Sequence, residues 1–330
     1  MGTSSEIKTK PLVCKIMTTE QINALFLKQL ALWDLAQKNY KALETVQEKQ
    51  FTINGNCYKV QFNPARIVSS AAKVDAKSIQ ERKCFLCRQN LPLEQIGLPF
   101  EANYQILVNP FPIFPRHLTV PDQQHTDQRI AGRFKDMLSL AEAATDYIIF
   151  YNGPRCGASA PDHMHFQAGN KGFLPLENDW KKQKAEKIGQ GTESTLWALN
   201  DEPRNTLVIE STNKDEATKL FDKIYQVLEA NSRNHAEEEP MMNLITWKEG
   251  KRFVTCLFPR VLHRPSCYHA EGDQNILISP ASVDMGGVFI TPLEKDFKKI
   301  TAEDLTNILK EVCLQSDDFA TLKTQLKAQL

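Results

Sequence analysis

The stretch Asp162-His163-Met164-His165-Phe166-Gln167 says most about how this chain folds. Its polar and apolar side chains alternate, which is typical of a β-strand with one face in the core. In such a strand His163, His165 and Gln167 project from one face, while Met164 and Phe166 turn into the core. Two histidines at this spacing can divide the work, because one can be held by a metal or a carboxylate while the other attacks phosphorus or moves a proton. For this segment alone, two satisfied strand histidines with no reactive role remain the alternative.

A loop rich in small residues, Tyr151 to Ala160, comes directly before this strand. Small side chains let the backbone approach a ligand closely, and exposed N–H groups there can donate hydrogen bonds to phosphate oxygens. Arg155 and Ser159 add side-chain donors. The loop is therefore a candidate anion site, and a tight turn without a ligand is the competing interpretation.

Cys84 and Cys87 form the one close pair among eight cysteines, which are too few for a disulfide scaffold in a chain of 330 residues. A C-x-x-C pair can place two thiolates on one zinc ion, but a closed site needs two further ligands. The available histidines are His117, His125, His163 and His165. Zinc would suit His125 and His163 beside the two cysteines, which leaves His165 free. The alternative is a pair of small buried hydrophobic side chains.

The segment from His117 to His125 is predicted to be a strand, a turn at Pro-Asp and a histidine near the start of a helix. Directly upstream, Asn109-Pro110-Phe111-Pro112 forms a rigid turn. Asn109 and Phe111 offer an amide and an aromatic ring, which could hold a nucleobase by edge hydrogen bonds and stacking. Proline-rich turns are mostly structural, so this assignment has a structural alternative.

The order of the predicted elements repeats along the chain. A capping box at Thr18 and Gln21 begins a helix after a polar arm at residues 1–17. Strands are then expected at 58–62, 104–108, 117–120, 148–151 and 163–167, with a helix at 127–144. A second set follows, with strands at 206–209, 241–247, 252–258, 275–278 and 287–290, a helix at 216–228 and helices after 301. We expect an α+β protein with an arm and helix (1–50), a first half (51–175), a Lys-rich connector (176–204) and a second half (205–330).

The composition excludes several classes of protein. The 40 basic residues balance the 40 acidic ones, so no overall field attracts nucleic acid or an anionic membrane. The N-terminus lacks the apolar core of a secretory signal, and no apolar run is long enough for a membrane span. We therefore expect a cytoplasmic protein that binds neither nucleic acid nor membranes. The P-loop, dinucleotide-binding and zinc-protease motifs are also missing from the sequence.

The ordered motifs resemble the histidine-triad superfamily in its nucleotidyltransferase and phosphorylase branch. They are C-x-x-C, N-P-F-P, H-L-x-V-P-x-x-x-H, G-x-S and H-x-H-x-Q, and they fall within residues 84–167. The likeness is weaker further on, around residues 243–246, 258–260 and 284–288. Galactose-1-phosphate uridylyltransferase, diadenosine tetraphosphate phosphorylase and the GDP-hexose phosphorylases belong to this branch. The resemblance implies two histidine-triad-like halves, each an antiparallel sheet with packed helices, and a catalytic site in the first half.

The resemblance also implies a mechanism. His165 would attack the α-phosphorus of a nucleoside diphosphate sugar or dinucleoside polyphosphate and form a nucleotidyl-histidine intermediate. Gln167 would hydrogen-bond the transferring group, and Gly157 and Ser159 would contact leaving-group phosphates, with Asn152 in the same loop. Phosphate or a sugar phosphate would then accept the nucleotidyl group. Arg155 and Arg260 are candidate cations, and structural Zn²⁺ at the cysteine pair is expected, although some branches lose it.

Two departures argue against galactose-1-phosphate uridylyltransferase itself. The spacing from Ser159 to His163 is one residue longer than in that pattern, and Asp162 stands where proline or asparagine is expected. Two other classes of function remain open, a nucleotide-binding sensor without turnover and a structural zinc module. The protein is expected to be a monomer or a homodimer.

Overall fold

The computed structural model describes residues 17–199, 203–232 and 239–330, so nearly all of the expected N-terminal arm lies outside the described part. The first helix, α1 (Thr19–Leu32), begins where the capping box predicts, and the backbone N–H of Thr18 donates to Oε1 of Gln21 (3.1 Å). The other helices are α2 (Asp34–Leu43), α3 (Ile67–Ser70), α4 (Ala76–Glu81), α5 (Phe134–Ala143), α6 (Leu176–Asp179), α7 (Lys214–Ala230), α8 (Ser266–His269), α9 (Ser282–Met285), α10 (Glu294–Lys299), α11 (Ala302–Val312) and α12 (Ser316–Gln329). In the described ranges, every helix is too short or too polar to cross a membrane.

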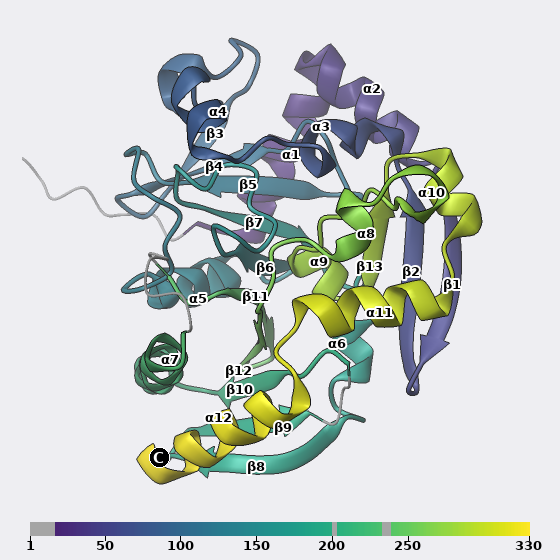
Figure 1. Cartoon of the computed structure of the whole chain (residues 1–330). Coiled ribbons are helices and arrows are strands. Elements are labelled where there is room, and N and C mark those ends of the chain that lie inside the picture. The colour runs from purple at the N-terminus through teal and green to yellow at the C-terminus, as the bar shows by residue number, and fades with distance from the viewer. Residues whose placement is uncertain (1–16, 200–202, 233–238) are drawn as a thin grey trace, which may run out of the picture.

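The strands form one large sheet and one small sheet (Figure 1). They are β1 (Gln47–Ile53), β2 (Asn56–Phe62), β3 (Gly97–Phe100), β4 (Tyr104–Val108), β5 (His117–Pro121), β6 (Tyr147–Asn152), β7 (His165–Asn170), β8 (Lys184–Gln190), β9 (Ser194–Leu199), β10 (Leu207–Ser211), β11 (Met242–Glu249), β12 (Arg252–Pro259) and β13 (Val288–Thr291).

The large sheet has ten antiparallel strands in the order β3-β4-β5-β7-β6-β11-β12-β10-β9-β8. Its first five strands come from the first half of the chain and its last five from residues after 183. The order β5-α5-β6-β7 in the first half recurs as β10-α7-β11-β12 in the second half. The two halves meet where β6 pairs with β11, so both belong to a single continuous sheet. This arrangement confirms the predicted α+β class with two related halves.

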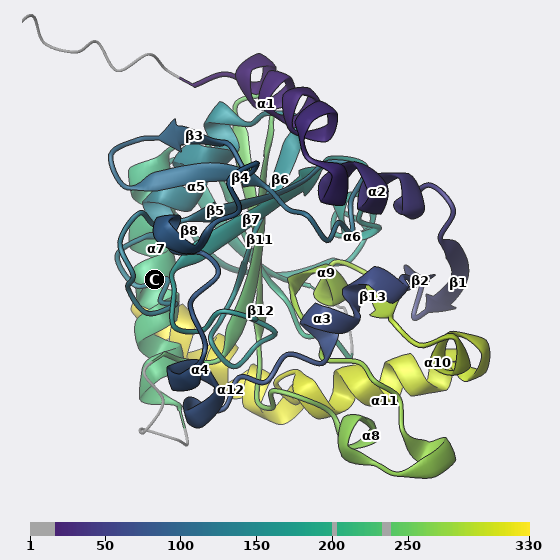
Figure 2. The same ribbon diagram turned by 90° about the horizontal axis from the view of Figure 1, so that it is seen from above.

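The two faces of the large sheet bury different clusters of side chains, because alternate residues of a strand point to opposite faces. In β6, Ile149 and Tyr151 belong to a core covered by α1, α5, α7 and α12, whereas Ile148 and Phe150 belong to a second core. The second core lies under α6, α9, α10, α11 and the small sheet β1-β2-β13 (Figures 1 and 2). In the small sheet, β13 runs parallel to β2 and so joins residues far apart in sequence.

Some predicted elements differ from those observed. Residues 275–278 do not form a strand, because the backbone N–H of Leu277 donates to a carboxylate oxygen of Asp296 (2.9 Å) rather than to a neighbouring strand. The range 176–204 links the two halves, but it also contributes α6, β8 and β9. Within it, Lys184 pairs with Glu210 (2.5 Å) and lies over the ring of Trp197. The lysine-rich stretch is therefore partly an edge of the large sheet.

Candidate functional site

A cavity of about 670 Å³ lies over the face of the sheet that carries His165 and Gln167. This volume is in the range of small-molecule sites. Both halves of the chain line the cavity, because Ser279, Ala281 and Asp284 of the second half face the first-half residues. Of the residues predicted to bind substrate or act in catalysis, the cavity brings together Asn109, Phe111, Asn152, Gly157, Ser159, His165 and Gln167.

The imidazole of His165 is held in one orientation at the start of β7. Its Nδ1 lies 2.8 Å from the carbonyl oxygen of His163, and a carbonyl can only accept a hydrogen bond, so Nδ1 carries the ring proton. The lone pair is then on Nε2. Burial lowers the pKa of His165 to about 4, so the ring is neutral near pH 7. A second contact fixes the backbone, because the N–H of His165 donates to Oε1 of Gln128 (2.8 Å).

His163 does not share a face with His165, contrary to the prediction from strand alternation. The strand begins only at His165, and His163 precedes it in a turn, where its N–H donates to the carbonyl of Ala160 (3.2 Å). The alternation holds from Met164 onward, since Met164 and Phe166 are buried in the core and Gln167 faces the cavity with His165. The side chain of His163 points instead toward the cysteine pair.

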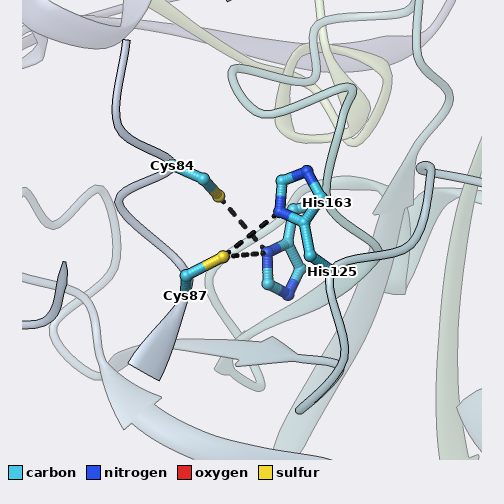
Figure 3. A group of neighbouring side chains, drawn as sticks. All are labelled: Cys84, Cys87, His125 and His163. Carbon is cyan, nitrogen blue, oxygen red and sulfur yellow. Dashed lines mark hydrogen bonds between the residues drawn. The ribbon is translucent and has the colours of Figure 1, made fainter. Parts of the chain in front are cut away.

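Cys84, Cys87, His125 and His163 form a cluster whose ligand atoms all lie within 4.8 Å of one another (Figure 3). The Sγ–Nδ1 distances are 3.3 Å for Cys84 and His163, 3.2 Å for Cys87 and His125, and 3.6 Å for Cys87 and His163. In a tetrahedral zinc site with Zn–S near 2.3 Å and Zn–N near 2.0 Å, sulfur and nitrogen are about 3.5 Å apart. The cluster therefore fits a tetrahedral metal ion, and it contains the four residues predicted from the sequence.

A second contact of His163 prepares it as a ligand. Its Nε2 lies 2.8 Å from the carbonyl oxygen of Asp122, so Nε2 carries the proton and Nδ1 is left for a metal. The backbone carbonyl of His163 also accepts the Nδ1–H of His165. Nearby, Arg82 pairs with Asp162, and Arg82 lines the cavity. His163 thus links the cysteine-histidine cluster to His165, which lines the cavity.

The small-residue loop closes one side of the cavity. Gly157 has a φ of +92°, and a Cβ atom there would lie 2.4 Å from the Cβ of Ala281, so only glycine lets the loop pack this closely on the second half. Asn152 at the end of β6 also ties the halves together, because its Oδ1 accepts hydrogen bonds from the backbone of Ser282 (2.7 Å) and the amide of Asn243 (3.1 Å).

The predicted arginines do not line the cavity. The side chain of Arg155 is exposed. Arg260 is buried and donates to Oδ1 of Asn243 (2.6 Å). Asn243 in turn donates to Asn152 at the cavity, so the link from Arg260 to Asn152 is indirect. The other hydrogen bonds of Arg260 go to the backbone carbonyls of Pro280, Leu262, His263 and Val312. The guanidinium of Arg260 thus holds the second half together.

The turn at Asn109 is also partly structural. The side chain of Asn109 accepts the backbone N–H of Phe111 (2.9 Å) and donates to Thr119 (3.0 Å), which keeps the Phe111 ring at the cavity wall. Arg66 donates to the carbonyl of Phe111 (2.8 Å) and brings a positive charge to the same wall. The sequence reasoning missed Arg66, which lies in no motif.

Two further residues, one at the cavity and one behind it, were not predicted as site residues. Asp284 is buried there, its side chain accepts the backbone N–H of Ala281 (2.8 Å), and burial raises its pKa to about 7. His117 lies behind the cavity, where its Nε2 is 3.0 Å from Oε1 of Gln167. A signal for His117 was present, because His117 and Thr119 alternate with apolar residues along β5 just as His165 and Gln167 do along β7.

Comparisons with known proteins agree with this architecture. Residues 25–170 match a family described as a domain of unknown function (DUF4922), and residues 180–330 match one described as the GDPGP1-like, C-terminal domain. A solved structure of yeast Ap4A phosphorylase Apa2 in complex with Ap4A has a TM-score of 0.62 at 16% identity, over 91% of this chain and 99% of that chain. A second Apa2 structure gives 0.60 at 17% identity, over 88% and 97%. The likeness to these structures establishes the fold. The search of curated proteins gives no match.

Proposed function

We propose that the chain is a member of the histidine-triad superfamily, in its nucleotidyltransferase and phosphorylase branch, and that it transfers a nucleotidyl group through His165. The substrate is a nucleoside diphosphate sugar or a dinucleoside polyphosphate, and the acceptor is inorganic phosphate or a sugar phosphate. The fold shared with an Ap4A phosphorylase and the size of the cavity support this proposal.

The observation that carries the proposal is the hydrogen bond from Nδ1 of His165 to the carbonyl of His163 (2.8 Å). It leaves the Nε2 lone pair of a neutral imidazole in the cavity, which is the form of histidine that can attack phosphorus. Attack would make the ring positively charged, and the carbonyl oxygen at Nδ1 would stabilise that charge.

The reaction proceeds in two displacement steps. In the first, Nε2 of His165 forms a bond to the α-phosphorus, and the bond from phosphorus to the leaving oxygen breaks, which releases a sugar phosphate or a nucleotide. In the second, an oxygen of the acceptor phosphate attacks the same phosphorus, the P–N bond breaks and His165 is regenerated. Gln167 and the backbone around Ser159 offer hydrogen-bond donors to the phosphoryl oxygens, and the charge of Arg66 lies at the same cavity.

Zinc belongs to the proposal as a structural ion. Cys84, Cys87, His125 and His163 would hold it, since the sulfur–nitrogen distances of 3.2–3.6 Å between them match those of a tetrahedral zinc site. Bound there, the ion would supply rigidity to the turn before β7. His163 itself, through its carbonyl, orients the ring of His165.

The test is turnover of a small panel of substrates. The protein is incubated with GDP-hexose, UDP-hexose or diadenosine tetraphosphate and inorganic phosphate, and the products are separated by chromatography. We expect at least one substrate to give a nucleoside diphosphate in a phosphate-dependent reaction that His165→Ala abolishes. Calorimetry measures binding of the same compounds. Tight nucleotide binding without any product would contradict the proposal and would indicate a nucleotide sensor.

A further inference from the structure

His117 lies directly behind Gln167, on the strand next to it. In the register of the sheet, Thr119 of β5 is opposite Gln167 of β7, and His117 is two residues before Thr119 on the same face. The ring of His117 is fully buried and touches the rings of Phe114 and Phe150 (centroid distances 5.4 and 5.9 Å). These contacts give the imidazole a single position.

The hydrogen bonds of His117 determine its tautomer. Its Nδ1 is 3.2 Å from the backbone nitrogen of Ile113, whose N–H can only donate, so Nδ1 accepts and carries no proton. Burial, together with the charge of Arg66, lowers the pKa of His117 to about 3, so the ring is neutral at physiological pH. A neutral imidazole with a bare Nδ1 has its proton on Nε2.

This proton decides which way the amide of Gln167 faces. The Nε2–H of His117 needs an acceptor, and the group 3.0 Å away is Oε1 of Gln167. If the amide were reversed, its NH₂ group would meet an N–H donor, which would lose the hydrogen bond and place two donors together. The NH₂ group of Gln167 is therefore turned away from His117. Within the described residues, no acceptor for that NH₂ group is found among the hydrogen bonds of the protein.

We propose that His117 is a positioning residue for nucleotidyl transfer, which fixes the amide of Gln167 so that it presents N–H donors, and not its carbonyl oxygen, to the transferring phosphoryl group. The inference rests on the proposed function of the same site. A glutamine amide has nearly equal shapes in its two orientations, so an adjacent group with a fixed donor is needed to choose one. With the carbonyl oxygen facing the phosphoryl oxygens, Gln167 would repel charge that it is expected to stabilise.

The test compares two replacements of His117 in two backgrounds. His117→Phe keeps an aromatic ring but has no donor, whereas His117→Gln keeps an amide N–H near the position of Nε2. In the wild-type background we expect His117→Phe to lower kcat by about ten- to a hundredfold with little change in KM, which is the pattern for a lost transition-state contact. His117→Gln should retain kcat within a few-fold.

The Gln167→Ala background separates positioning from packing. If His117 acts through Gln167, then His117→Phe should lower kcat no further once the amide is gone, so the two effects are not additive. An equal loss of kcat in both backgrounds would overturn the inference, because it would show that His117 only supports the fold. Equal kcat values for His117→Phe and His117→Gln would overturn it as well.

A measurement without turnover keeps this inference distinct from the proposed function. Nitrogen-15 NMR of the His117 ring in the intact protein should show a protonated Nε2 and a bare Nδ1 at neutral pH. A protonated Nδ1 would refute the orientation argument even in an active enzyme. Failure of the wild-type protein to transfer any nucleotidyl group would instead refute the proposed function, and with it the catalytic role of His117.

Discussion

Replacing Gly157 with alanine would show whether the cavity depends on close packing between the two halves. A Cβ atom at Gly157 would lie 2.4 Å from the Cβ and 2.8 Å from the Cα of Ala281. Non-bonded carbon atoms normally stay about 3.5 Å apart or more. The loop that carries Ser159 must therefore move away from Ala281 by about 1 Å, or the second half must move instead.

Two costs add in this variant. Alanine at a φ of +92° costs about 1–2 kcal/mol, because its Cβ approaches the following carbonyl. Overpacking against Ala281 costs about 1–3 kcal/mol more. We expect the free energy of unfolding to fall by about 2–5 kcal/mol. A displacement of about 1 Å at a catalytic site can cost on the order of a hundredfold in rate, so kcat should fall by about ten- to a hundredfold.

Gly172→Ala is the matched control, because Gly172 has a φ of +81° and a Cβ there would meet no atom within 4 Å. It should show only the backbone cost and keep its kcat. Urea unfolding gives the stabilities, and phosphate-dependent turnover gives kcat. Ala281→Gly in the Gly157→Ala background removes the closest contact and should restore part of both losses. Equal stability and equal kcat for Gly157→Ala and Gly172→Ala would refute the packing described between the halves.

Two more predictions concern the cluster and a buried carboxyl group. Metal analysis of Cys84→Ser should show that zinc is lost, and its free energy of unfolding should fall by about 3–4 kcal/mol, which is the stabilisation that an ion at hundreds of times its Kd supplies. Cys57→Ser, which lies outside the cluster, should change neither the zinc content nor the stability. Wild-type protein without zinc would contradict this prediction. Burial raises the pKa of Glu239 to about 7, and the carboxyl accepts hydrogen bonds from Tyr151 and the backbone of Ile130. The unfolded chain releases this proton near pH 4.5 and the folded chain near pH 7, so Glu239 should lower the free energy of unfolding by up to about 3 kcal/mol as pH rises over that interval. Urea unfolding from pH 4 to 8 should show that the free energy of unfolding declines less in Glu239→Gln than in the wild type. An identical pH dependence of stability in the two proteins would contradict this prediction.

Local sequence patterns predict much of the fold. The apolar runs at 104–108 and 252–258 coincide with β4 and with most of β12, and the helical periodicity at 216–228 lies within α7. Each of these signals depends on residues close together in sequence. By contrast, the parallel pairing of β13 with β2 joins residues 288–291 to residues 59–62, and no local pattern specifies such a partner.

In the site, too, local sequence patterns predicted some residues, whereas the contacts of others depend on the folded structure. Cys84 and Cys87 were predicted as metal ligands from their C-x-x-C spacing, and His125 and His163 were chosen from the few histidines available to complete the site. Arg260 was misplaced because a sequence shows its charge but not the buried carbonyl oxygens that it satisfies. His163 does not share the face of His165 because it lies in the turn that starts at Ala160, before β7 begins, and side chains alternate regularly only within the strand.

Trapping the covalent intermediate tests the proposed role of His165 most directly. The protein is mixed with an α-labelled nucleotide substrate in the absence of any phosphate acceptor, digested and mapped by mass spectrometry. We expect one nucleoside monophosphate attached to His165, labile in acid, discharged by added phosphate and missing in His165→Ala. Phosphate-dependent turnover with no adduct, or an adduct on any other residue, would contradict that role.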